Sequence, residues 1–139
     1  MVDRSVVRAK VGAIQIRLHE LKIRRGVTGT QLARDRAVQA IILHNYQVAI
    51  QACCDLASHI VADQELGIPG TSAELFEILG QAKIIPVSLA ERLKEHVGLR
   101  NLIVHAYDKL NYRTVADTLP QRIRDVSVFL RAIIAYAKL

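Results

Sequence analysis

Four side chains that could act together on a phosphate lie in one short segment, from Arg100 to Tyr107. Arginine carries a permanent charge and can bind a phosphate through two hydrogen bonds, and histidine can move a proton near neutral pH. Asn101 and Tyr107 add polar groups that can orient the phosphate or the imidazole of His105. These residue types fit cleavage of an RNA phosphodiester, because the 2′-hydroxyl of the substrate is its own nucleophile and no metal is needed. We therefore take Arg100 and His105 as the candidate catalytic pair.

The geometry of this pair depends on the helix that carries it. On a continuous helix Asn101 and His105 share one face, and Arg100, Val104 and Tyr107 share the next. Arg100 and His105 are then separated by about 140° around the axis. Three arrangements would bring them together: the helix ends or distorts near His105, the arginine reaches round, or two copies of the chain combine their groups.

A purely structural interpretation of the same residues is also open. Arg100 can pair with a carboxylate, His105 can cap the carboxyl end of a helix, and Tyr107 can fill an interface. The residue types alone do not decide between this interpretation and a catalytic one.

The composition limits what the rest of the chain can be. A length of 139 residues favours a single domain over 1–139, and 51% hydrophobic with 23% charged residues is typical of a globular protein. The longest apolar runs have four to six residues, whereas a spanning helix needs about 20. The start of the chain lacks an apolar signal segment, so we expect a cytoplasmic protein with no membrane partner. A net charge of +6 favours polyanionic partners.

The spacing of apolar residues predicts an all-α fold, an antiparallel bundle of about five helices. A first helix carries an apolar stripe over 7–21 and ends in the glycine-containing segment 26–29, a flexible breaker. A second helix, with its stripe over 38–60, extends over roughly 30 residues and ends at 67–70.

Two capping boxes predict the next two helix starts. Thr71–Glu74 begins a short third helix, and Ser88–Glu91 begins a fourth that continues toward His105. The last helix carries its apolar stripe from Val115 to Ala137 and contains Pro120, which either begins the helix proper or kinks it.

The segment Arg100-Asn101, followed by His105-Ala106-Tyr107, resembles the R-x4-H-x-Y motif of HepT-like toxins, within the HEPN class of helical ribonucleases. Similar runs occur at 45–47, 51–57 and 66–69, and the resemblance covers roughly residues 30 to 135. The chain departs from the family at Tyr46, where a leucine is usual, and at His44.

The resemblance implies a homodimer whose two motif helices line a cleft, with Arg100 and His105 of both chains forming a composite, metal-independent endoribonuclease site. It also implies a toxin of a type VII (formerly type II) toxin–antitoxin pair. The partner would be a minimal nucleotidyltransferase antitoxin that adds AMP to Tyr107, placing negative charge and bulk where RNA must bind. The alternative function is a non-catalytic nucleotide- or partner-binding subunit of a nucleotidyltransferase complex, and a structural interaction protein comes third.

Several residues outside the motif have a simpler explanation. Cys53 and Cys54 are expected to be reduced core thiols, and with His19, His44 and His96 they give no zinc spacing, so we expect no metal and no cofactor.

Polar residues on two other helices leave alternatives open. Asn45 lies on the apolar stripe of the second helix, where a structural role is favoured over an accessory place at the cleft. Asp55 and His59 are expected to form a pair on the helix surface. The basic residues of the last helix either follow a phosphate backbone or are only solvated; they are Arg122, Arg124, Arg131 and Lys138.

Overall fold

Within residues 2–139, which the computed structural model describes, the chain forms helices and no strand. The elements are α1 (Arg4–Ile23), α2 (Gly29–Arg34), α3 (Arg36–Asp63), α4 (Ser72–Gln81), α5 (Val87–His105), the 3₁₀ helix η1 (Tyr107–Lys109) and α6 (Tyr112–Ala137). The predicted all-α fold is confirmed, with one short helix more than expected. None of the helices in this part of the chain is long and apolar enough to span a bilayer.

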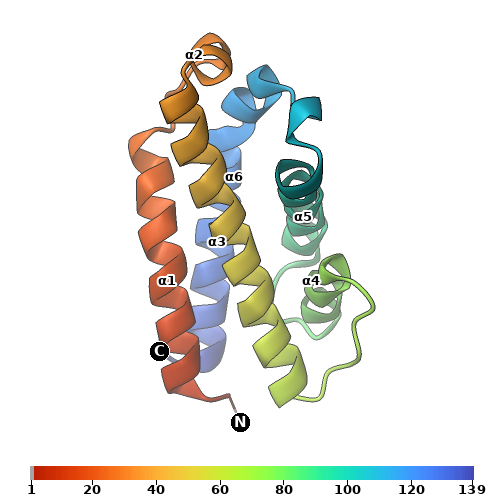
Figure 1. The fold of residues 1–139 in the computed structure, drawn as a ribbon. Coiled ribbons are helices and arrows are strands. Elements are labelled where there is room, and N and C mark those ends of the chain that lie inside the picture. The colour runs from red at the N-terminus through yellow and green to blue at the C-terminus, as the bar shows by residue number, and fades with distance from the viewer. Residues whose placement is uncertain (1) are drawn as a thin grey trace.

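The long helices α1, α3 and α6 lie side by side, and α4 and α5 pack along one side of them (Figure 1). α3 contacts α1, α2, α4 and α5, so its 28 residues connect most of the molecule. The apolar residues of the predicted first stripe are all buried; they are Val7, Val11, Ile14, Leu18 and Leu21. Phe76 of α4 meets Phe129 of α6 edge to face, with ring centroids 5.7 Å apart. The core therefore lies between α3 and the helices around it.

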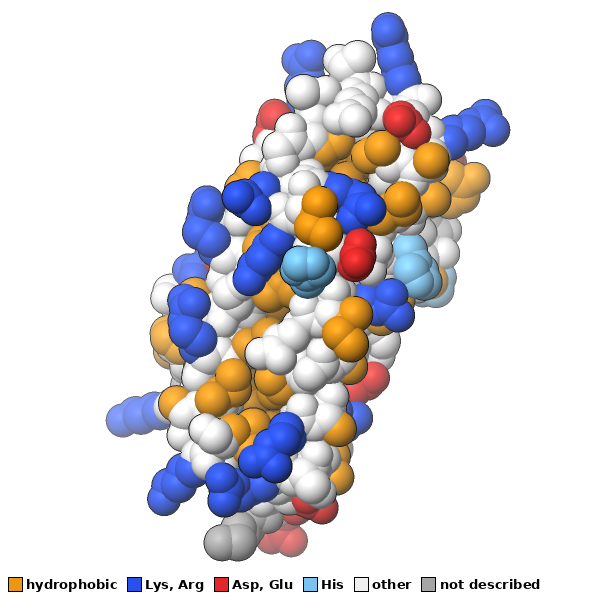
Figure 2. Space-filling view, turned by 90° about the vertical axis from the view of Figure 1, so that its left-hand side faces the viewer, with side chains coloured by type: hydrophobic (Ala, Val, Ile, Leu, Met, Phe, Trp, Pro, Cys, Tyr) orange, Lys and Arg blue, Asp and Glu red, His pale blue; other side chains and the backbone are white. Residues whose placement is uncertain are grey.

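The charge excess is visible on the side that α1 forms. Figure 2 shows this face, where Lys and Arg side chains outnumber Asp and Glu. Arg8, Lys22 and Arg25 are among the exposed basic residues of this part of the chain. A surface of this kind attracts polyanions without selecting one.

The two predicted capping boxes have different outcomes. Thr71 caps α4, its hydroxyl accepting a hydrogen bond from the Glu74 amide at 3.3 Å. The Glu74 carboxylate accepts from the Gly70 amide at 2.6 Å. The box at Ser88 is wrong, because α5 begins at Val87 with Pro86 as its N-cap and no side-chain cap. An N-cap residue must itself be non-helical, and Ser88 already lies within the first turn.

This difference gives a matched pair of stability predictions. Thr71→Ala is expected to lower the free energy of unfolding by about 1 kcal/mol, because the Glu74 amide loses its acceptor. Ser88→Ala is expected to change it by less than about 0.5 kcal/mol. Urea denaturation of both variants measures the difference, and equal losses would show that the hydroxyl of Thr71 does not cap α4.

The segment that follows α1 contains a helix that was not predicted. The expected breaker at 26–29 ends in α2, which Thr28 caps by accepting from the Gln31 amide at 3.1 Å. α2 has six residues and buries only Leu32, so it is too short to show a helical period. Its first residue, Gly29, lies against α6, where an added Cβ would be 2.9 Å from Cα of Arg113.

Pro120 does not begin the last helix. α6 starts at Tyr112, where the Asn111 side chain caps it by accepting from the Thr114 amide at 3.1 Å, and Pro120 lies inside it. Asn is among the favoured N-cap residues, so this cap fixes the start of the helix ahead of the proline.

Candidate functional site

The motif residues lie at the carboxyl end of α5 and in the turn that follows it. Asn101 is exposed one turn before the end of the helix, and His105 is the last helical residue and also exposed. Tyr107 begins η1 with 62% of its surface exposed. Three of the four functional groups are therefore open to solvent at one end of α5.

The backbone leaves the helix directly after His105. Ala106 has φ −152° and ψ 46°, and its amide still donates to the Leu102 carbonyl at 2.9 Å. The chain then turns into η1, so Tyr107 does not continue the helical face of Arg100 and Val104. A continuous helix would have placed these three residues on one face, and the structure does not meet that condition for the tyrosine. The helix does end at His105, which was one of the three arrangements considered.

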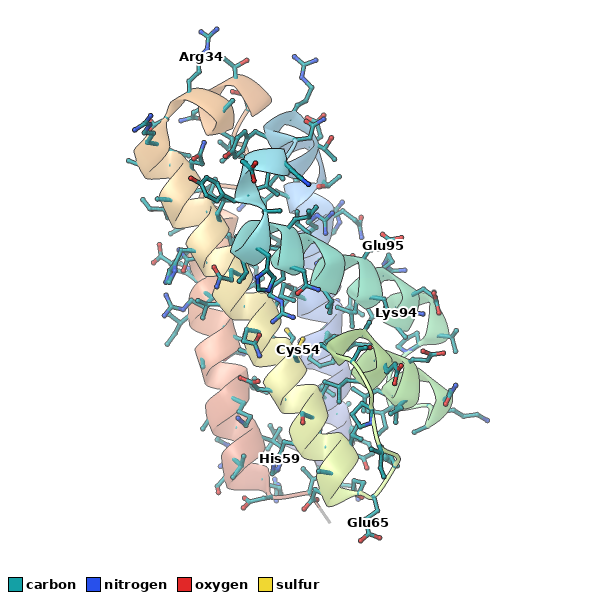
Figure 3. The ribbon with its side chains drawn as sticks, turned by 45° about the vertical axis from the view of Figure 1, so that its right-hand side comes forward. Arg34, Cys54, His59, Glu65, Lys94 and Glu95 are labelled. Atoms are coloured by element: carbon teal, nitrogen blue, oxygen red, sulfur yellow. The ribbon has the colours of Figure 1, made fainter. Side chains whose placement is uncertain are left out.

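Arg100 is directed toward α3. Its Nη1 donates to Oε1 of Gln51, and its Nε is buried with no hydrogen-bond acceptor among residues 2–139. Its charge also acts on the thiol of Cys54, which lies on the side of α3 that faces α4 and α5 (Figure 3). Burial raises the pKa of Cys54 to about 11, although the nearby guanidinium opposes this shift.

No hydrogen bond joins Arg100 to His105 within the described residues. His105 is exposed at the end of α5, whereas Arg100 is bonded to Gln51 of α3. The arginine also forms no ion pair with a carboxylate in this part of the chain, contrary to the structural interpretation of Arg100.

Three large apolar side chains of the motif segment are exposed: Leu102, Val104 and Tyr107, which are 41%, 45% and 62% exposed. Leu102 and Val104 are two residues apart on α5, so about 200° separates them around the helix axis and they lie on different faces.

The family of the chain follows from comparison with known proteins. Residues 14–133 match the family described as Ribonuclease HepT-like. The chain belongs to this family. The resemblance that the motif indicated is therefore confirmed.

Named relatives of this HepT-like protein are nucleases. The mRNA nuclease HepT of Shewanella oneidensis is 37% identical over 105 residues, which cover 76% of this chain and 79% of the relative. The tRNA nuclease HepT of Aphanizomenon flos-aquae is 30% identical over 90 residues, 65% of this chain and 61% of that relative. A solved structure of the tri-AMPylated Shewanella oneidensis HEPN toxin in complex with MNT antitoxin is 33% identical, with a TM-score of 0.86 over 97% of this chain and 99% of that one.

A buried polar network of this HepT-like protein was not predicted. The Tyr46 hydroxyl is 2.7 Å from Nδ1 of His96, whose Nε2 is 3.0 Å from Oδ2 of Asp125. Oδ1 of Asp125 accepts from Nε of Arg92 and Nε2 of Gln121, both at 2.9 Å. His96 and Asp125 are 2% and 3% exposed. The network joins α3, α5 and α6 one helical turn before Arg100.

Protonation within the network follows from burial and pairing. Burial lowers the pKa of His96, and this outweighs the opposing effect of Asp125. Burial also opposes ionisation of Asp125, but hydrogen bonds from His96, Gln121 and Arg92 outweigh it and hold the pKa of that carboxyl below its usual value. At neutral pH, neutral His96 therefore donates to anionic Asp125 and accepts from the Tyr46 hydroxyl.

The lowered pKa of His96 makes stability depend on pH. The folded state resists protonation of His96, whereas the unfolded chain protonates near the usual pKa of 6.5. Its contribution to stability is therefore complete above pH 6.5 and is lost as the pH falls through the lower pKa of the folded state. Denaturation at a series of pH values is expected to show this loss, and His96→Gln is expected to reduce it. An equal pH dependence in the variant would contradict the assignment.

Other polar residues on α3 have contacts of their own. Asn45 is buried; its amide donates to the Ile41 carbonyl at 2.8 Å and its carbonyl accepts from Nη1 of Arg17 at 3.3 Å. These contacts tie α3 to α1 and fit the structural role expected for the amide.

The expected surface pair of Asp55 and His59 is wrong. Asp55 accepts from Nε2 of Gln51 at 3.0 Å instead, because that amide lies one turn before it on the same face. Nε2 of His59 is buried and has no hydrogen-bond partner among residues 2–139. No group of three or more His, Cys, Asp or Glu that could hold a metal occurs in the same range.

Proposed function

We propose that this protein is the ribonuclease toxin of a toxin–antitoxin pair and that it cuts RNA without a metal ion. The observation that carries the proposal is the exposed imidazole of His105 at the end of α5, one helical turn beyond the half-buried guanidinium of Arg100. Membership of the Ribonuclease HepT-like family supports the reaction class. The named relatives support it further, since they are nucleases of mRNA and of tRNA.

The proposed reaction uses the 2′-hydroxyl of the RNA. That oxygen attacks the adjacent phosphorus, the bond from phosphorus to the 5′ oxygen breaks, and a 2′,3′-cyclic phosphate is left. His105 accepts or donates the proton, and Arg100 stabilises the charge that develops on the phosphorane. Asn101 and Tyr107 orient the phosphate. Because the nucleophile belongs to the substrate, no metal-bound water is required.

A homodimer would complete the site. In one chain Arg100 is bonded to Gln51 of α3 and not to His105, and a two-fold axis can bring the arginine of one copy to the histidine of the other. Val104, which is 45% exposed and lies one turn after Arg100 on the same face of α5, gives such an axis an apolar side chain to bury.

Cleavage in the presence of a chelator tests the reaction. Purified protein is incubated with total RNA in excess EDTA, and the fragment ends are analysed. Cleavage that leaves 2′,3′-cyclic phosphate supports the proposal. No cleavage by protein shown by mass to be unmodified at Tyr107 overturns it and favours a non-catalytic nucleotide- or partner-binding subunit.

We further propose that a minimal nucleotidyltransferase antitoxin adds AMP to Tyr107. The tyrosine is 62% exposed in η1, where a second enzyme can reach its hydroxyl. The structural neighbour bound to MNT antitoxin is itself AMPylated. Modified Tyr107 would place negative charge and bulk beside His105, which repels and obstructs RNA.

Incubation with the cognate nucleotidyltransferase and ATP is expected to add AMP units to the wild type and to abolish its RNA cleavage. Tyr107→Phe is expected to gain no mass and to cleave RNA more slowly than the unmodified wild type, because it lacks the hydroxyl that orients the phosphate, but its remaining cleavage is expected to be unchanged by the incubation. Tyr112→Phe is the control, since Tyr112 is half-buried at the start of α6. Intact mass and cleavage are measured together, and equal mass gain by Tyr107→Phe and the wild type would place the modification elsewhere.

A further inference from the structure

A cavity of about 300 Å³ lies beside the motif, between α5, η1 and the first turns of α6. This volume is at the lower end of the range of about 300–1,000 Å³ for small-ligand sites. Leu102, three residues before His105 on α5, lines it, and so does Lys109, the last residue of the turn that Tyr107 begins. The cavity therefore lies next to the end of α5 that carries His105.

Arg122 contributes a fixed positive charge to this cavity. Its Nη1 donates to the Tyr46 hydroxyl at 3.1 Å, and its Nε donates to Oγ1 of Thr118 at 3.0 Å. The guanidinium also lies 5.8 Å from the centre of the Tyr46 ring. It forms no ion pair with a carboxylate among residues 2–139. A guanidinium that is held in place without a counter-ion is prepared for an anionic ligand.

The remaining lining residues combine charge with apolar surface. Lys109 is exposed and makes no ion pair in the described range, and Glu95, on the outer side of α5 (Figure 3), is the carboxylate of the lining. Two cations against one anion leave a net positive site. Leu99, Leu110 and Val115 supply apolar walls. A ligand with an aromatic face and a phosphate matches both kinds of surface.

We propose that this cavity is a nucleotide subsite of the RNA substrate. It holds one base against the apolar walls and the adjoining phosphate on Lys109 and Arg122. The subsite rests on the proposed ribonuclease function and extends it, because it positions the strand next to the bond that Arg100 and His105 act on. Of the four basic residues considered above as a phosphate track, only Arg122 lines the cavity.

Binding of single-stranded RNA oligonucleotides tests the subsite. The variants are made in the His105→Ala background, so that RNA is bound and not cut, and Kd is measured by fluorescence anisotropy at several salt concentrations. Lys109→Ala and Arg122→Gln are each expected to weaken binding roughly fivefold or more and to lower the salt slope by about 1. Glu95→Gln is expected to strengthen binding, since the variant removes repulsion of the phosphate.

Arg124→Ala is the matched control. Arg124 is exposed and lies about 200° around α6 from Arg122. Its substitution therefore removes the same charge from the opposite face of the helix. We expect this variant to change Kd less than twofold. Lys109 is exposed, so its variant tests the subsite even where Arg122→Gln alters packing against Tyr46.

Two results would overturn the subsite. In the first, Lys109→Ala and Arg124→Ala bind RNA equally well. In the second, Lys109→Ala weakens self-association in sedimentation and leaves RNA binding unchanged, which assigns the cavity to contact between copies. If the wild type cleaves RNA in EDTA, either result overturns the subsite alone. If the unmodified wild type does not cleave RNA, the ribonuclease function itself is overturned.

Discussion

His105→Ala is expected to lower the rate of RNA cleavage by about 10²–10⁴-fold, because removal of a general acid or base has an effect of that size. The side chain is exposed at the last residue of α5, so stability is expected to change by less than about 0.5 kcal/mol. Single-turnover cleavage in excess EDTA measures the first effect and thermal unfolding the second. His19→Ala, an exposed histidine on α1, is the control. Cleavage by His105→Ala at the wild-type rate would exclude His105 from the reaction.

Mixing two inactive variants then tests whether the site is shared between copies. A dimer of one Arg100→Ala chain and one His105→Ala chain keeps one intact arginine and one intact histidine, on different chains. Random reassociation puts one of each in about half of the dimers. If the pair forms across the interface, the mixture regains part of the wild-type activity. If each chain supplies its own pair, the mixture stays inactive.

The second large effect is on stability. Asp125→Ala is expected to lower the free energy of unfolding by about 3–5 kcal/mol, because His96 and Arg92 lose their buried acceptor. Asp117→Ala, at an exposed position of the same helix, is expected to change it by less than about 0.5 kcal/mol. Denaturation in guanidinium chloride measures both. Equal stability of the two variants would show that the network contributes nothing net to folding.

Loss of this network is also expected to lower RNA cleavage, because it would disturb the position of the motif residues on α5. His96 lies one turn before Arg100 on α5 and is the point at which α5 is bonded to both α3 and α6. Asp125→Asn keeps an acceptor in the same place and should retain more of both stability and cleavage than Asp125→Ala.

The helices could be predicted wherever burial is periodic over several turns. The apolar stripe of α1 is buried throughout, and the end of α3 lies before the predicted breaker at 67–70. α2 could not be predicted, because six residues with one buried leucine contain no period. The start of α5 was misplaced because Pro86 sets the helix start one residue before the serine of an apparent capping box.

The candidate site could be predicted only where its residues are close together in the sequence. The R-x4-H-x-Y segment is contiguous, so its position at the end of one helix followed from the sequence. The partner of Arg100 is Gln51 on another helix, and that of His96 is Asp125 on a third, so neither pairing is encoded in local spacing. A signal for the network did exist, since His96 and Asp125 each occupy a buried position within an apolar stripe. The homodimer and the roles of Arg100 and His105 stay predictions.

The two cysteines of α3 allow the rate at which this helix opens to be measured by thiol labelling. Cys53 and Cys54 are 0% and 2% exposed, and burial raises the pKa of both thiols. Because the thiolate is the form that reacts, neither is alkylated while α3 stays packed against its neighbours. A timed pulse of alkylating reagent therefore marks only chains in which α3 has opened, and the native sequence reports its own unfolding rate without an added label.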